Sequence, residues 1–467
     1  MVLFKEKCLY LMIAGMVNYI LGLGVVLWKI SHAPVREYSK GCLDCARTPG
    51  QTHRAAHGEN RSSGLPASDP NFSHCGPFKD PQDTVFGYWN WKKVSMCDGH
   101  LIAYRDKFAL LRNVIVDRKR SKEWSVAGIA PDRVPHQKEE NEFISIKKGF
   151  FQILCSGTLT AVFNETQMKR MWLQKTMTTD TSLDKYAIIP RESKMTIIVT
   201  RFGYANAYWA IVDMYNAFLL QNFFGKSCTE VKVLLLDSHP WGAFDGMWNT
   251  VFGKMLRLTD LHNVTLFKTV VWGMQSNQSP MLRRHMPHLP FVRPFRETML
   301  HRHGVRPQHS QACKTSKLNV LFIWRHDYVA HPRNPSGRVT RKIANEGELL
   351  NHLQKTFPSF NISGIQLDKL TIANQLQLVS ATDILIAMHG AALAFTVFMT
   401  PGSGVIELYP KGHGVSWHFE NLARWNGVHY TRWQNVDFDA ENQEATFIPP
   451  AVASRLVRDM SQQVCPE

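Results

Sequence analysis

Residues 387–410, AMHGAALAFTVFMTPGSGVIELYP, place a histidine and a glycine between two apolar runs. Where a glycine turn opens a helix, backbone N–H groups and the positive helix end can bind a phosphate. His389 and Gly390 are therefore candidates for the floor of a phosphate site, and Ala391 begins a short apolar helix predicted over 391–399. The alternative is a buried histidine that caps a helix inside any α/β core.

Two charged residues lie at equivalent places on neighbouring apolar runs. Arg325 directly follows the run 318–324, where its guanidinium could contact a phosphate in bidentate fashion. Glu407 lies late in the run 405–409 and could accept hydrogen bonds from ribose hydroxyls. Each could instead form a structural salt bridge. Their position at the carboxyl ends of neighbouring strands favours one shared site.

A parallel sheet is needed to bring these residues together. The runs 318–324, 383–388 and 405–409 are short, β-branched and apolar on both faces, which is typical of buried parallel strands. Helices predicted over 345–357 and 449–464 complete a doubly wound sheet. Upstream, strands at 195–202 and 231–237 flank a helix over 204–225, so both halves are predicted to be α/β. The basic, proline-interrupted residues 281–317 are interpreted as an interdomain connection.

The absence of several well-known motifs excludes the reaction types that depend on them. The chain has no G-x-G-x-x-G after its first strands, no Walker A loop and no G-x-S-x-G elbow. Its Asp437-Phe-Asp439 pair could hold a nucleotide-bound metal, but a polar loop near the C-terminus favours a surface turn. Two α/β halves behind the membrane anchor described below favour instead a transferase with its donor in a cleft between them. Basic residues would replace the metal and stabilise a leaving diphosphate.

The N-terminus indicates where the chain works. Residues 8–28 carry no charge and are long enough to span a bilayer, which favours an uncleaved signal anchor over a cleaved signal peptide. Eight cysteines outside that span are an even number, as expected for disulfides in an oxidising lumen. Glycosylation sequons agree with a luminal chain and occur at Asn60, Asn71, Asn164, Asn263, Asn277 and Asn361.

The net charge of +16 suits nucleic acid, anionic membrane or phosphorylated substrates. A luminal location removes nucleic acid from these. The predicted organisation is a cytoplasmic tail at 1–7, a transmembrane anchor at 8–28, a flexible stem at 29–85, an N-terminal acceptor domain at 86–310 and a C-terminal nucleotide-sugar domain at 311–467.

Three segments together resemble glycosyltransferase family 61: TRFGYANAYWAIVDMYNAF (200–218), LFIWRHDYVAHPR (321–333) and the opening stretch. Within the family, the runs at 200–206, 327–333 and 418–430 are most similar to the β-1,2-xylosyltransferases of N-glycan processing. The resemblance implies a GT-B fold, with two Rossmann-like domains facing a cleft, in a single-pass type II Golgi membrane enzyme. It also implies inverting transfer from UDP-xylose, with no cofactor required, to the 2-hydroxyl of the core β-mannose of N-glycans on glycoproteins.

An inverting transfer needs one base for the acceptor proton. Asp213 is the first candidate, on the helix expected to face the cleft, and a helix-surface or supporting carboxylate is the alternative. Asn206 and Trp209 share its side of the helix and are predicted to bind the acceptor. The family commonly carries histidine where this chain has Trp209, which makes Asp327 and His331 alternative bases and lets Trp209 stack on a sugar face.

Two other functions stay open at this point. An O-linked GlcNAc transferase of the same family would use UDP-GlcNAc and would share the His-Gly-Ala turn. A catalytically silent Golgi glycan-binding protein is the alternative from another class, and Trp209 is the residue that motivates it.

Overall fold

The computed structural model describes residues 75–78, 93–105, 107–123, 126–130, 133–155, 176–180, 188–306, 313, 317–436 and 444–466. The predicted tail, the predicted anchor, most of the predicted stem, Asp437 and Asp439 lie outside these residues. Within the described ranges, no helix has the length and apolar character needed to cross a membrane. The chain divides into the units Met1–Asp69 and Pro70–Glu467, and every described residue belongs to the second unit.

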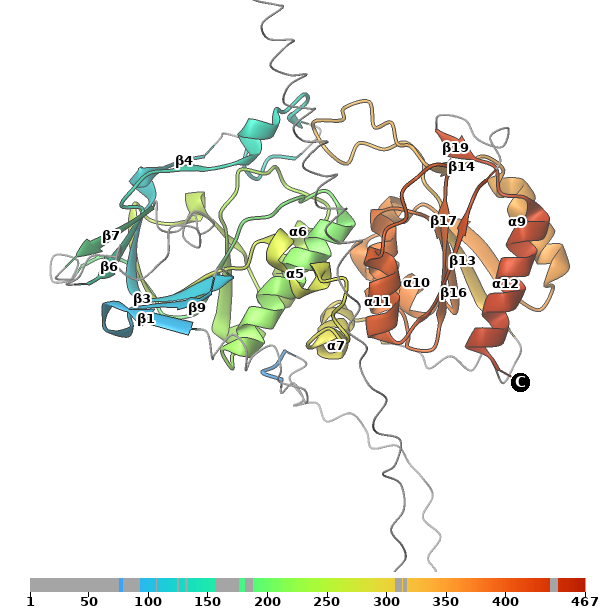
Figure 1. The fold of residues 1–467 in the computed structure, drawn as a ribbon. Helices are drawn as coiled ribbons and strands as arrows, with labels where there is room; N and C mark the ends of the chain where they lie inside the picture. The colour runs from blue at the N-terminus through green and yellow to red at the C-terminus, as the bar shows by residue number, and fades with distance from the viewer. Residues whose placement is uncertain are drawn as a thin grey trace, which may run out of the picture. The chain divides into compact units, whose positions relative to one another are not determined.

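The first half builds a ten-stranded mixed sheet, ordered β1-β2-β3-β12-β9-β10-β11 (Figure 1). Off this path, β6 pairs with β3, β7 with β6, and β8 with β12. Strands β12, β9, β10 and β11 run parallel, whereas β3 is antiparallel to β12. The strands are β1 (Lys93–Met96), β2 (Leu101–Tyr104), β3 (Phe108–Asp117), β6 (Phe151–Leu154), β7 (Met177–Asp180), β8 (Arg191–Glu192), β9 (Met195–Val199), β10 (Val231–Leu235), β11 (Leu256–Arg257) and β12 (Val264–Trp272).

Helix α5 (Ala207–Phe223) connects β9 to β10 and confirms the helix predicted over 204–225. The Asn206 side chain caps it by accepting hydrogen bonds from the Tyr208 and Trp209 N–H groups. All of its residues except Trp209 and Phe223 are buried, because α5 contacts both β9 and the 3₁₀ helix η12 of the second half. The interpretation of Asp213 as a helix-surface residue is therefore wrong. The shorter helix α6 (Asp245–Phe252) follows β10.

The second half holds a five-stranded parallel sheet ordered β15-β13-β16-β17-β18. The strands predicted at 318–324, 383–388 and 405–409 are confirmed, and the helix predicted over 391–399 is 3₁₀ rather than α. The elements are β13 (Asn319–Ile323), α9 (Glu346–Thr356), β15 (Asn361–Ile365), α10 (Ile372–Ser380), β16 (Ile384–Met388), η12 (Ala391–Phe398), β17 (Gly404–Tyr409), α11 (His418–Asn426), β18 (His429–Gln434) and α12 (Pro450–Val464).

Alternate side chains of these strands enter two different apolar cores, so both faces of the sheet are covered. Leu321 and Leu385 belong to the core that includes residues of α10, η12 and α11. Phe322 and Ile386 belong to the core that includes residues of α9 and α12. Figure 1 shows α9 and α12 on one side of the strands and α10 and α11 on the other. The α/β prediction is confirmed, and this half fits a Rossmann-like fold.

The strand order of the second sheet reverses at β13, and this reversal indicates where a ligand would bind. From β13 the chain passes to β15 on one side, then returns to β16 on the other. At such a switch point the connections leave in opposite directions, so the carboxyl ends of the two central strands are open to a ligand. Arg325 follows β13 and His389 follows β16.

The basic segment 281–317 contains the helix α7 (Val292–Arg302), which its prediction as a plain connection missed. Phe295 is fully buried against Tyr215 and Phe218 of α5. Arg296 is also buried and donates to the Met399 carbonyl oxygen at 2.8 Å. The segment therefore packs the two sheets' helices together as well as connecting them.

Smaller pairings and disulfides complete the described fold. Disulfides join Cys75 to Cys228, Cys97 to Cys155 and Cys313 to Cys465, which confirms the disulfide prediction for six cysteines. The remaining pair, Cys42 and Cys45, lies outside the described residues. The two-stranded sheets are β4 (Ser121–Lys122) with β5 (Ser145–Ile146), and β14 (Lys342–Ile343) with β19 (Ala445–Thr446).

Candidate active site

Two arginines meet at the carboxyl edge of the second sheet, at the two ends of the loop 325–341. Arg325 Nε donates to the Thr340 carbonyl oxygen at 3.1 Å. Burial and the charge of Arg341 lower the pKa of Arg325 to about 10. Arg341 has φ 62°, a left-handed conformation that costs a non-glycine residue about 1 kcal/mol. Among the described residues neither guanidinium lies within ion-pair distance of a carboxylate, although the buried Glu407 charge acts on Arg341, so two adjacent cations favour an anionic ligand.

Gly390 is required by the closeness of Arg325. Its backbone is extended, with φ 169°, so conformational freedom is not the reason for a glycine here. A Cβ atom built at Gly390 would overlap Nη1 of Arg325. The 3₁₀ helix η12 begins at Ala391, and the first N–H groups of a helix have no partner within it. The predicted His389-Gly390-Ala391 turn and Arg325 are therefore brought together.

His389 is held by a buried carboxylate. Its Nδ1 donates to Glu407 Oε1 at 2.5 Å, and Tyr430 Oη donates to Glu407 Oε2 at 2.6 Å. Burial and the Glu407 charge raise the pKa of Tyr430, which keeps that hydroxyl a donor. Glu407 is completely buried, so it is placed to orient His389 rather than to contact a ribose. With Nδ1 engaged, Nε2 is the imidazole nitrogen left for a ligand.

The buried carboxyl group of Asp213 holds the segment 200–206 between β9 and α5, called here the Phe202 turn. Its Oδ1 accepts from Ser276 Oγ at 2.5 Å, and its Oδ2 accepts from the Phe202 N–H at 3.2 Å. Burial raises the pKa of Asp213 to about 7, although both hydrogen bonds act to lower it. A carboxyl with this pKa suits proton transfer near neutral pH. Only 2% of Asp213 is exposed, so the Phe202 turn covers it.

An aromatic surface lies over Asp213. The Phe202 and Trp209 rings make an edge contact with centroids 4.6 Å apart, and 63% of Phe202 is exposed. Exposed aromatic rings suit the apolar face of a sugar, which agrees with the predicted acceptor role of Trp209. Asn206 is exposed, but its Oδ1 is used in capping α5. The predicted acceptor residues therefore sit at one end of α5.

The start of α5 also lies against residues of the second half. The Tyr208 ring contacts the rings of His418 and Phe419 at 5.3 and 5.8 Å. Phe419 in turn packs on His389 at 5.3 Å. These contacts connect the Trp209 end of α5 to the residues that follow β16.

The two alternative bases are poorly placed for that role. Asp327 pairs with Lys342 Nζ at 2.8 Å and accepts from the Val339 N–H, and these contacts lower its pKa. His331 Nδ1 accepts from the Arg333 N–H at 3.0 Å, so its proton lies on Nε2, which faces Glu142 at 3.0 Å. Asp213 is the better candidate because its pKa is raised to about 7, whereas the contacts of Asp327 lower its pKa and both ring nitrogens of His331 face protein groups.

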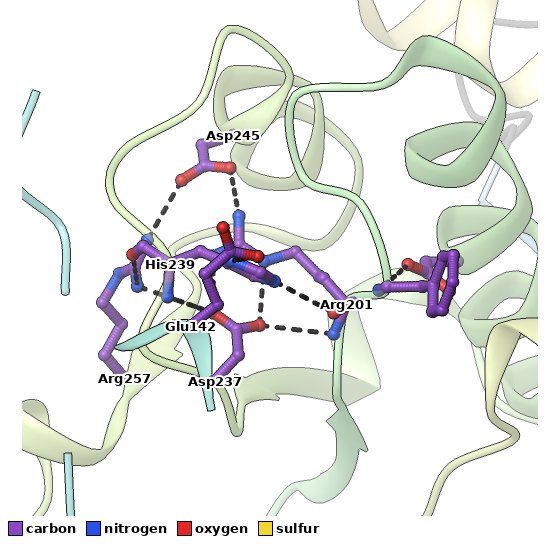
Figure 2. A network of polar contacts seen from close by, with 8 residues as sticks. Glu142, Arg201, Asp237, His239, Asp245 and Arg257 are labelled. Carbon is purple, nitrogen blue, oxygen red and sulfur yellow. Dashed lines mark hydrogen bonds and ion pairs between the residues drawn. The ribbon is translucent and has the colours of Figure 1, made fainter. Parts of the chain in front are cut away.

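The sequence predictions missed a buried charge network at the carboxyl edge of the first sheet, shown in Figure 2. Arg201 pairs with Asp237 at 2.8 Å and with Asp245 at 2.5 Å, and Arg257 pairs with Asp245 at 3.1 Å. Burial opposes ionisation of Asp237, but the Arg201 charge holds its pKa well below the usual range. Charged residues directly after the buried strands β9 and β10 were the available signal. Arg341 lies in a basic loop and Tyr430 lies inside a strand, so the sequence did not mark either of them as a site residue.

Comparisons with known proteins agree with this arrangement. A family model described as Glycosyltransferase 61 matches residues 162–406. The β-1,2-xylosyltransferase of Arabidopsis thaliana is 24% identical over 307 residues, covering 58% of this chain and 56% of that protein. The β-1,2-xylosyltransferase RCN11 of Oryza sativa subsp. japonica is 24% identical over 259 residues, covering 50% and 48%.

A second kind of relative matches about as well. The EGF domain-specific O-linked N-acetylglucosamine transferase of Bos taurus is 27% identical over 243 residues, covering 49% of this chain and 43% of that protein. The chain spans about half the length of the curated relatives it matches.

Proposed function

Because the chain belongs to the glycosyltransferase 61 family, we propose that it transfers xylose from UDP-xylose to the 2-hydroxyl of the core β-mannose of N-glycans, with inversion at the sugar carbon. The observation that carries the proposal is a pair of half-buried arginines at the switch point of the parallel sheet: Arg325 lies against Gly390, and the charge of Arg341 acts on Arg325. Two positive charges side by side match the diphosphate of a nucleotide sugar.

The donor half acts on the leaving group in this proposal. As the bond between the sugar carbon and the diphosphate oxygen breaks, negative charge grows on that oxygen. Arg325, Arg341 and the N–H groups that begin η12 stabilise it without a metal ion. His389, oriented by Glu407, directs Nε2 at the same group. This is the GT-B arrangement, with the donor on the second α/β half and the acceptor on the first.

The acceptor half supplies the base. Asp213 takes the proton of the attacking hydroxyl, and a pKa of about 7 lets it accept that proton and release it again. Because Asp213 is buried beneath the Phe202 turn, access requires this turn to move when the acceptor binds. Trp209 and Phe202 stack on the acceptor sugar.

Two observations support xylose as the donor sugar. The run Asp-Tyr-Val-Ala-His-Pro-Arg at 327–333 resembles the β-1,2-xylosyltransferase branch of the family. Two relatives named β-1,2-xylosyltransferase match 58% and 50% of the chain. The second candidate is an O-linked GlcNAc transferase, which the bovine relative supports at similar identity.

We also propose that the protein is a type II Golgi membrane protein, anchored by residues 8–28. The uncharged N-terminal span supports this, as do three disulfides in the described part of the chain.

A matrix of two donors and two acceptors tests the proposal. Purified protein is incubated with UDP-xylose or UDP-GlcNAc, and with an N-glycan carrying the core β-mannose or a folded EGF domain. Pentose added to the N-glycan, with UDP released, is the expected result. N-acetylhexosamine added to the EGF domain would select the second candidate. Glycan binding without UDP release from either donor would refute both transferase activities.

A further inference from the structure

We propose that Glu142, on the first half, is a positioning residue that fixes loop 325–341 so that Arg325 and Arg341 face the donor diphosphate. The inference rests on the proposed function for the identity of the ligand. In this inference, Glu142 of the first half acts through loop 325–341 on the two arginines of the second half.

Loop 325–341 is braced along its length, so its tip and its ends move together. Tyr328 N–H donates to the Gly337 carbonyl oxygen at 2.9 Å, and Asp327 Oδ1 accepts from the Val339 N–H at 2.8 Å. At the base of the loop, Arg325 Nε donates to the Thr340 carbonyl oxygen. Displacing the tip therefore shifts the two arginines.

The tip rests on Glu142, which is 3% exposed. Glu142 Oε1 lies 3.0 Å from His331 Nε2 and 2.9 Å from Arg333 Nε. Next to this ion pair, the His136 N–H donates to the Pro332 carbonyl oxygen at 3.0 Å. One buried carboxylate thus holds two residues of the loop, and a buried carboxylate that loses its partners is costly.

Glu142 is itself fixed to the buried network of the first sheet. It ends the 3₁₀ helix η4 (Glu139–Glu142), and its carbonyl oxygen accepts from the Ser238 N–H at 3.0 Å. Figure 2 shows it beside Arg201, Asp237 and His239. The Tyr204 ring packs on His239 at 4.5 Å and on His331 at 5.2 Å. The carboxyl edge of the first sheet is thereby connected to the arginines at the carboxyl edge of the second.

Glu139 offers a matched control on the same short helix. It pairs with Arg333 Nη1 at 3.3 Å, but 69% of its side chain is exposed, and such surface pairs contribute little. Glu139→Gln and Glu142→Gln make the same chemical change at carboxylates that lie 3.3 and 2.9 Å from the Arg333 guanidinium, and only Glu142 is buried.

The experiment measures pyrophosphate binding by the full-length protein, by titration calorimetry in the presence of a chelator. If about a tenth of the Glu142→Gln molecules keep the loop in its binding conformation, the apparent Kd for pyrophosphate rises about tenfold. Glu139→Gln should leave the Kd unchanged. Hydrogen exchange of the backbone amides in loop 325–341 should accelerate in Glu142→Gln alone. Arg333→Gln removes the other half of the contact and should also raise the Kd, which keeps the test decisive if Glu142→Gln fails to fold.

Each outcome has one meaning. An unchanged pyrophosphate Kd in Glu142→Gln, or in Arg333→Gln if the first variant fails to fold, would overturn the inference, as would a wild-type protein that binds no pyrophosphate. A wild-type protein that binds pyrophosphate but transfers no sugar would refute the proposed function, and the positioning role would stand on the Kd of the variants.

Discussion

Replacing Arg325 by glutamine should weaken UDP binding while stabilising the free protein. Glutamine can still donate a hydrogen bond towards the Thr340 carbonyl oxygen, so the change removes mainly the charge. An arginine kept for the fold would behave in the opposite way, because its loss would lower stability and leave binding alone. The two measurements together therefore separate a ligand-binding role from a structural one.

The magnitude follows from the environment of the guanidinium. Its pKa falls from 12.5 to about 10 because of burial and the neighbouring Arg341 charge. A pKa change of one corresponds to about 1.4 kcal/mol, so keeping this group charged lowers the stability of the free protein by up to about 3 kcal/mol. A charge-assisted hydrogen bond to the diphosphate contributes about 1.5–3 kcal/mol, so Arg325→Gln should raise the UDP Kd about 10- to 150-fold.

Titration calorimetry with UDP gives the affinity, and scanning calorimetry gives the Tm. We expect the Tm of Arg325→Gln to stay level or rise. Arg338→Gln is the control, because Arg338 lies in the same loop but is 67% exposed and pairs with Glu444. A lowered Tm together with an unchanged UDP Kd in Arg325→Gln would refute the reasoning.

Three further predictions concern other groups of the site. Glu407→Gln removes the buried carboxylate charge that orients the His389 ring through Nδ1 and should weaken UDP binding about tenfold in the same titration; unchanged affinity would contradict this. Because burial raises the pKa of Asp213 from 3.8 to about 7, its contribution to stability is full below pH 4 and is lost as the pH rises through 7. Denaturant titrations should show the free energy of unfolding falling over that range in wild type but not in Asp213→Asn. Sugar transfer should persist in the presence of a chelator, and Asp437→Ala should leave the transfer rate nearly unchanged. Activity that is lost on chelation and restored by Mn²⁺ would contradict metal independence.

The strands and helices of the second half could be predicted because they are encoded locally. Apolar runs bounded by glycine and polar residues place β13, β16 and β17 within a residue or two of their observed limits. The candidate residues Arg325 and His389 followed from position alone, since both come directly after such runs. Helix α7 was missed because Pro294, three arginines and one histidine obscure its buried face, which includes Phe295.

The partners of the site residues could not be predicted, because long-range packing decides them. Glu407 was expected to face a ligand, yet Tyr430 and His389 come to it from β18 and from the end of β16. Arg341 and Glu142 lie in charged segments with no apolar periodicity, so nothing in the sequence marks them as neighbours of Arg325 and His331. Asp213 was placed on the correct helix, but its burial depends on contacts of α5 with both halves.

A crystal structure of the protein with UDP, grown in the presence of a chelator, would test the central claim most directly. The diphosphate should lie within hydrogen-bond distance of the Arg325 and Arg341 guanidinium groups and of the N–H groups that begin η12 at Ala391, with no metal ion bridging it. A diphosphate bound elsewhere, or one held through a cation, would contradict the account.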